Sequence, residues 1–172
     1  MKRIVTLKEG ILYLPVRPLY LISMQCQGEM NIITVRMCHI FSFDPPRIGT
    51  GIHKIRHSYG LMARSREFVV NVPTRELLEA VKLCGQKSGR DVDKFAETGL
   101  TAKKGLMVDA PLIEECPVNF ECKVDKELDL EERTWYIGEV LTVHVDDEYR
   151  NENTIVSWGG HYRTLNGVVL KW

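Results

Sequence analysis

The sequence carries no excess of either charge. Lysine and arginine together number 23, as do aspartate and glutamate, so the formal net charge is zero. Proteins that bind nucleic acids usually carry a basic excess or a basic face, because the phosphates they contact must be neutralised. The balance therefore argues against a nucleic-acid partner, although it is compatible with a local basic pocket.

The chain also lacks the cysteine spacing of a zinc ribbon or a dithiol redox motif. Its cysteines are irregularly spaced and include no C-x-x-C pair. His53 and His57 lie four residues apart, but no acidic or cysteine ligand is close to them in sequence, so we expect no metal site. The five cysteines are Cys26, Cys38, Cys84, Cys116 and Cys122.

Long apolar runs are missing as well. The longest are far shorter than the roughly 20 residues that cross a bilayer. No uncharged apolar segment follows the basic start Met1-Lys2-Arg3, as a signal peptide would require. We therefore expect a cytoplasmic protein without a membrane partner, whose thiols are reduced and mostly buried.

Runs rich in Ile, Val and Thr predict many strands and few helices. The helices do not alternate regularly with the strands, which argues against a doubly wound parallel sheet. The pattern instead predicts a mainly β fold with inserted helices, in an antiparallel barrel. Without a repeat or a linker, residues 1–172 are expected to form a single domain. The expected strands are 19–24, 31–40, 48–52, 68–72, 118–124, 135–145, 154–158 and 168–172, and the expected helices are 58–65, 74–85 and 92–98.

The segment Arg56-His57-Ser58 precedes a short helical pattern. The first turn of a helix offers free backbone N–H groups and a partial positive charge. Arginine adds a bidentate donor and serine a hydroxyl, so the segment fits a phosphate group. The alternative is a solvated loop in which Ser58 only caps the helix.

Three further segments allow both a binding and a structural interpretation. The loop after residue 84 could supply donors from Lys87, Ser88 and Lys94 or be an ordinary surface loop, and Cys84 is more typical of a buried thiol than of a nucleophile. Segment 31–34 could present polar groups to a ligand or simply be an edge strand. The aromatic pairs at 135–136 and 158–162 could frame a planar ring or pack in the core.

Taken in order, these segments resemble the flavin reductase-like family of FMN-binding split barrels. The resemblance implies an antiparallel split β-barrel with bound FMN, a homodimer, and electron transfer from NADH or NADPH through the flavin. The matching motifs are N-I-I-T at 31–34, S-F-D-P-P at 42–46, R-H-S at 56–58, F-V-V-N-V-P at 68–73, C-G-Q-K-S-G at 84–89 with D-K-F at 93–95, and I-G-E-V at 137–140.

The resemblance also implies site residues. The R-H-S segment would hold the FMN phosphate, the N-I-I-T strand would meet the polar edge of the ring, and the loop after Cys84 would add donors. Relatives often carry histidine where this chain has Arg133, which cannot titrate near neutral pH. The implied cofactor-binding residues are Asn31, Thr34, Arg56, His57, Ser58, Ser88, Lys94, Arg133 and Tyr162.

The expected function is therefore an FMN-dependent oxidoreductase that passes electrons from NAD(P)H to a flavin or another acceptor, with a redox partner protein among the acceptors considered. Hydride transfer to a flavin needs no acid–base side chain, so no catalytic residue is assigned. The first alternative is an FMN-bound electron-transfer protein, flavoredoxin-like, without NAD(P)H oxidation of its own. The second is a barrel-fold binding module without flavin.

Overall fold

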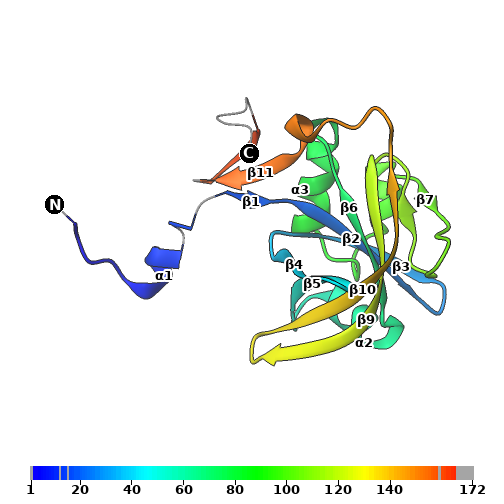
Figure 1. Cartoon of the computed structure of the whole chain (residues 1–172), viewed down its shortest axis with the longest axis horizontal. Helices are drawn as coiled ribbons and strands as arrows, with labels where there is room; N and C mark the ends of the chain where they lie inside the picture. Colours follow the sequence, from blue (N-terminus) through cyan, green and yellow to red (C-terminus); the bar gives the residue numbers. More distant parts are fainter. Residues whose placement is uncertain (1, 12, 15, 159, 166–172) are drawn as a thin grey trace.

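A computed structural model describes residues 2–11, 13–14, 16–158 and 160–165 of the chain. Antiparallel strands make up most of its regular secondary structure, with short helices between them (Figure 1). The strands are β1 (Arg17–Pro18), β2 (Tyr20–Cys26), β3 (Glu29–Val35), β4 (Cys38–Phe43), β5 (Pro46–His53), β6 (Glu67–Val72), β7 (Ala102–Lys103), β8 (Leu112–Ile113), β9 (Val118–Leu130), β10 (Arg133–Val145), β11 (Ile155–Trp158) and β12 (His161–Thr164). The helices are α1 (Leu7–Ile11), α2 (His57–Ser65), η1 (Arg75–Leu77), α3 (Leu78–Gln86), α4 (Lys94–Thr98) and η2 (Asn151–Asn153).

The main sheet has seven strands in the order β3-β2-β6-β9-β10-β5-β4. All its pairings within the described residues are antiparallel, and the register of β9 against β10 shifts between Ile137 and Gly138 and again between Val140 and Thr142. Such bulges increase the local twist of a sheet. The predicted mainly β, antiparallel split-barrel fold is confirmed. A smaller sheet, β1-β11-β12, joins segments from near the two ends of the chain.

The side chains of β2 alternate between two cores, as the period of a strand requires. Ile22 and Met24 lie in a core that α2 enters with Leu61 and Met62. Leu21 points to the opposite face, into a core that also contains residues of α3 and α4. The sheet therefore has α2 against one face and the α3–α4 pair against the other, and the connections to these helices bring residues 56–58 and 84–94 together.

The expected strand at 31–40 is two strands. β3 ends at Val35 and pairs with β2, whereas β4 begins at Cys38 and pairs with β5 at the far end of the sheet order. The run of β-favouring residues continues through the break, and the turn at Arg36 and Met37 contains neither glycine nor proline. The sequence pattern therefore had no signal for the break. The expected strand at 168–172 lies outside the described residues.

The helix starts also differ from the expected ones. Arg56, not Ser58, occupies the N-cap of α2, and Ser58 is the second residue of the helix. Gly85 lies inside α3, which continues to Gln86. The third helix agrees better with the expectation, because Asp93 caps α4 through the N–H groups of Phe95 and Ala96, and Gly99 ends it in the left-handed conformation.

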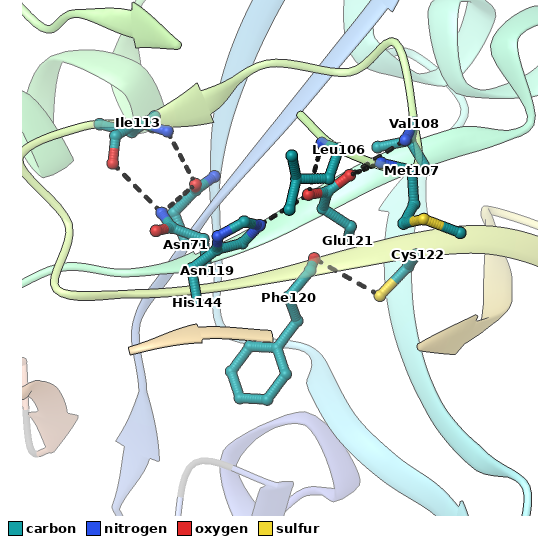
Figure 2. A network of polar contacts seen from close by, with 10 residues as sticks. All are labelled: Asn71, Leu106, Met107, Val108, Ile113, Asn119, Phe120, Glu121, Cys122 and His144. Carbon is teal, nitrogen blue, oxygen red and sulfur yellow. Dashed lines mark hydrogen bonds and ion pairs between the residues drawn. The ribbon is translucent and has the colours of Figure 1, made fainter. Parts of the chain in front are cut away.

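A buried polar network attaches the segment around β8 to the sheet (Figure 2). The side-chain oxygen of Asn71 in β6 accepts from the N–H of Ile113 at 3.0 Å and from the amide of Asn119 in β9 at 2.8 Å. Asn119 also donates to the carbonyl of Ile113 at 3.1 Å. The asparagine of the F-V-V-N-V-P segment therefore has a structural role between the sheet and β8.

Glu121 of β9 anchors the neighbouring loop in the same view (Figure 2). Its fully buried carboxylate accepts N–H bonds from Leu106, Met107 and Val108 at 2.7–3.0 Å, and His144 of β10 contacts it through Nε2 at 2.7 Å. Burial alone would raise the pKa of this carboxyl group, but the four contacts favour the charged form and lower the pKa below its usual value. The loop is thus held to the sheet by an ionised side chain.

Candidate functional site

Two neighbouring cavities lie beside the N-terminus of α2, and Arg56 lines both of them. The smaller has a volume of about 140 Å³ and the larger about 580 Å³. The smaller is lined by Ile33, Ile55, Arg56, His57, Ser58, Cys84, Lys87, Ser88, Gly89, Arg90 and Lys94. The larger is lined by Leu14, Arg17, Leu19, Thr34, Arg36, Arg56, Val81, Lys82, Gly85, Gln86, Ser157, Trp158, Gly160, His161 and Tyr162.

The smaller cavity, which we call the anion pocket, is formed by three segments. They are residues 55–58 at the start of α2, the loop that follows α3, and the first residue of α4, with Ile33 of β3 and Cys84 of α3 completing the lining. The N–H groups of His57 and Ser58 belong to the first turn of α2, where a helix has no internal acceptor for them. The pocket therefore combines backbone donors, the positive end of a helix dipole and basic side chains.

The charged side chains that line the anion pocket are all basic. Arg56, Lys87, Arg90 and Lys94 line it, and the described residues contribute no carboxylate to its wall. Glu29 lies close by but is engaged by His57, whose Nε2 is 2.6 Å from its Oε1. A site with several cations and exposed N–H groups suits a phosphate, which offers several acceptor oxygens and a negative charge.

Lys94 is an unusual member of this set because it is buried and only 4% exposed. Its Nζ donates to the carbonyl oxygens of Ile32 at 2.7 Å and Cys84 at 2.8 Å, with no carboxylate partner among the described residues. Burial lowers the pKa of this ammonium group, and the nearby Arg56 lowers it further. An anion in the pocket would favour the charged form of Lys94.

Asn31 and Ser58 meet behind the anion pocket. Both side chains are buried, and Asn31 Nδ2 donates to Ser58 Oγ at 2.8 Å. The backbone of Gly89 packs directly against this pair, because a Cβ at Gly89 would overlap the Asn31 side-chain oxygen and lie 2.9 Å from Cδ2 of His57. A glycine is needed there for the loop to approach so closely.

The larger cavity combines cations with aromatic side chains. Trp158 comes from β11, and His161 and Tyr162 come from β12. Thr34 of β3 and residues of α3 also line the cavity. The cations are Arg17, Arg36, Arg56 and Lys82, and again no carboxylate of the described chain lines the wall. The volume lies in the range of small-molecule sites.

Thr34 links β3 to α3 at the wall of the larger cavity. Its Oγ1 donates to the carbonyl of Val81 at 2.6 Å, and Gly85 lies close to its Cβ. The hydroxyl hydrogen is therefore used inside the protein. The lone pairs of Thr34 Oγ1 remain as acceptors toward the cavity.

The structure brings most of the predicted site residues together but separates two of them. Arg133 begins β10 and lines neither cavity; it contacts Glu132 at 2.9–3.0 Å and Met37 Sδ at 2.9 Å. Asn31 also lines neither cavity, although it touches Ser58. The residues that line a cavity are Arg56, His57, Ser58, Ser88 and Lys94 in the anion pocket and Thr34, Arg56 and Tyr162 in the larger one.

Sequence reasoning missed several lining cations. Arg36 lies two residues after the N-I-I-T segment, and Lys82 lies two residues before the C-G-Q-K-S-G segment and four residues before Gln86 on the same face of α3. Arg90 follows the predicted loop donors and reaches the carbonyl of Ile55 at 3.4 Å. Each of these basic residues lies beside a segment that the sequence had marked as a candidate for binding, and this proximity was the available signal.

For two residues, the structure supports a structural role and not a binding or catalytic one. Tyr136 is 1% exposed and lies in the core with α2, so this member of the 135–136 pair is a packing residue. Cys84 is buried, and burial raises the pKa of its thiol to about 11 although Lys94 partly offsets the effect. Its thiol is therefore protonated near neutral pH, which disfavours a role as nucleophile.

Comparisons with known proteins give a family match and several relatives. A family model described as "Flavin reductase like domain" matches residues 14–166. Uncharacterized proteins of Archaeoglobus fulgidus and Pyrococcus abyssi are 36% and 31% identical to the chain; the alignments cover 70% and 75% of this chain and 68% and 74% of those proteins. None of the helices in the described part of the chain is long and apolar enough to cross a membrane.

Solved structures share the fold over nearly the whole chain. Flavoredoxin from Methanosarcina acetivorans superposes with a TM-score of 0.88 at 22% identity, covering 99% of this chain and 96% of that one. Flavoredoxin of Desulfovibrio vulgaris (Miyazaki F) gives 0.87 at 26% identity, covering 99% and 97%. An FMN-binding protein from Thermus thermophilus gives 0.88 at 19% identity, covering 99% and 98%.

Proposed function

Because this chain belongs to the flavin reductase like domain family, we propose that it binds FMN and passes electrons from NADH or NADPH through the flavin to a flavin or another acceptor. The observation that carries the proposal is the anion pocket. Four cations and the start of α2 surround a space of about 140 Å³ without a carboxylate from the described chain. That donor set fits a phosphate monoester, and the adjoining larger cavity offers aromatic and polar groups to a planar ring.

In this proposal the residues of the two cavities have different roles. Arg56, Lys87, Ser88 and the N–H groups at the start of α2 bind the phosphate. Thr34 and Tyr162 face the larger space, where they would orient the ring and exclude water from one side of it. Bound FMN would supply the redox chemistry, and the protein would fix its position and electrostatic environment.

The pocket is tested by comparing FMN with riboflavin, which has the same ring but no phosphate. We expect FMN to bind more tightly than riboflavin. Arg56→Ala should weaken FMN binding by about tenfold, in line with the loss of one charge-assisted hydrogen bond. It should weaken riboflavin binding less, because Arg56 also lines the larger cavity. Arg75→Ala, an exposed arginine of η1 paired with Glu76, is the matched control and should change neither. Equal affinity of the native protein for both flavins would contradict the phosphate assignment.

The electron donor is tested by mixing the FMN-loaded protein with NADH or NADPH under anaerobic conditions. Rapid bleaching near about 450 nm, the band of oxidised flavin, is expected for an oxidoreductase with its own nicotinamide reaction. The similarity to two flavoredoxins favours the alternative of an electron-transfer protein. In that case the flavin would remain oxidised with either nucleotide and be reduced only by a redox partner protein.

We also propose that the protein is a homodimer. β4 lies at the edge of the main sheet and exposes Ile40 (62%) and Phe43 (84%), together with Phe41. An edge strand with adjacent exposed apolar side chains is a typical contact surface between chains. Light scattering on Phe43→Asp should show a shift from dimer to monomer, whereas a native protein that is already monomeric would contradict the proposal.

A further inference from the structure

The pair formed by Asn31 and Ser58 has a directional hydrogen bond. Asn31 of β3 and Ser58 of α2 are each 2% exposed, and Asn31 Nδ2 donates to Ser58 Oγ at 2.8 Å. The side-chain oxygen of Asn31 faces the backbone of Gly89 on the other side. The amide group is therefore held between β3, the start of α2 and the loop after α3.

A serine hydroxyl has one hydrogen and two lone pairs. In Ser58 one lone pair accepts from Asn31, and the hydrogen has no acceptor among the described residues. A serine in a helix usually donates to the carbonyl three or four residues earlier. For Ser58 these residues are Ile55 and Lys54, which precede the helix, and the Ile55 carbonyl accepts from Arg90 at 3.4 Å.

Ser58 lines the anion pocket, so its unused hydrogen is available to a ligand there. We propose that Asn31 is a positioning residue: it holds the Ser58 hydroxyl as a hydrogen-bond donor toward the phosphate of the bound flavin nucleotide. The inference rests on the proposed function, because it requires the phosphate to occupy the anion pocket. It differs from the role that the family resemblance implies for Asn31, which is contact with the polar edge of the ring.

The direction of the bond explains why an asparagine fits this position. Its N–H makes the hydroxyl a better donor, since hydrogen bonds in a chain polarise one another. An aspartate would reverse the bond: its carboxylate would accept the Ser58 hydrogen, turn the serine lone pairs toward the phosphate and add a negative charge close to it. The two substitutions therefore have different expected effects on the same ligand.

The test measures the equilibrium affinity of the full chain for FMN and for riboflavin by flavin fluorescence, in the native protein, Asn31→Ala and Asn31→Asp. We expect Asn31→Ala to weaken FMN binding by about tenfold and Asn31→Asp by about a hundredfold. Riboflavin affinity should stay within about twofold in both variants, because riboflavin has no phosphate for Ser58 to bind. Thermal unfolding of each variant shows whether it is folded under the conditions of the measurement.

Serine variants supply a second route if an Asn31 variant does not fold. Ser58→Ala should weaken FMN binding about as much as Asn31→Ala, and the double variant should bind FMN no more weakly than Ser58→Ala alone. Ser65→Ala, at the other end of α2, is the matched control, because Ser65 donates to the Glu67 carbonyl away from the pocket. It should leave both affinities unchanged.

The outcomes separate this inference from the proposed function. If the native protein binds FMN and riboflavin equally, the phosphate assignment fails and the role of Asn31 fails with it. If the native protein prefers FMN but Asn31→Ala weakens both flavins to the same extent, Asn31 contacts the ring and only the inference is overturned. Additive losses in the double variant would likewise overturn it, because they would show that Asn31 and Ser58 act independently.

Discussion

Replacing Glu121 by glutamine should lower the free energy of unfolding by about 3 kcal/mol at neutral pH. The two carboxylate oxygens share four contacts, and each oxygen takes two of them. A glutamine keeps only one such oxygen and turns an NH₂ group toward the other contacts, so the partly buried N–H of Leu106 loses its acceptor. An unsatisfied buried N–H costs about 1–3 kcal/mol, and loss of the charge weakens the remaining bonds.

The effect should depend on pH in one direction. The pKa of Glu121 is lowered in the folded protein, so its ionisation contributes stability that is fully present above the unfolded pKa of about 4.3. That contribution is lost as the pH falls through the lowered folded pKa. Glutamine does not ionise, so the stability difference between the two proteins should be constant from pH 7 to 5 and should shrink below about pH 4.

Urea unfolding at several pH values measures this difference directly. A loss of 3 kcal/mol corresponds to a fall in Tm on the order of 6–12 °C for a chain of this size. Glu97→Gln, an exposed carboxylate in α4, is the control and should change stability by less than about 0.5 kcal/mol. A difference for Glu121→Gln below about 1 kcal/mol at pH 7, or one that is the same at every pH, would refute the reasoning.

Three further predictions concern the thiols and the anion pocket. At neutral pH a disulfide reagent should modify the partly exposed Cys26 of the native protein quickly and the four buried cysteines, Cys84 included, only slowly; rapid reaction of Cys84 would contradict its burial. Gly89→Ala should weaken FMN binding at least tenfold, because the added Cβ would displace the Asn31 and His57 side chains, and unchanged affinity in a titration would show that the loop is free to move. Lys94→Met should weaken FMN binding and lower the free energy of unfolding by about 2 kcal/mol or more, because methionine fills the buried space but leaves two carbonyls without a donor. Calorimetry that found unaltered FMN affinity would exclude Lys94 from the pocket.

The sequence was sufficient where local patterns decide the structure. The expected helix at 92–98 corresponds to α4, and the expected strand at 68–72, which is bounded by clear signals, corresponds to β6. The R-H-S segment was correctly placed at a helix start, although the cap was assigned to Ser58 and is in fact Arg56. Local chemistry therefore predicted a binding site at this helix start, and the residues of the segment line the anion pocket.

Contacts between distant segments could not be predicted in this way. Asn31 and Ser58 are 27 residues apart, and no periodicity connects them. Glu121 is a similar case, because a glutamate within an alternating strand would ordinarily be assigned to the solvent side. The side chain is buried only because the loop at 106–108 covers that face of β9. The position of this loop is determined by tertiary packing and not by the local sequence of β9.

The two cavities depend on different parts of the chain. All residues that line the anion pocket lie between 33 and 94, whereas the larger cavity also takes part of its wall from residues 14, 17 and 19 and from residues 157, 158 and 160–162. β1 and β11 pair beside it, so segments near both termini form one wall (Figure 1). A proteolytic cut within β1 or β11 would therefore act on the larger cavity, whereas neither strand contributes a residue to the anion pocket.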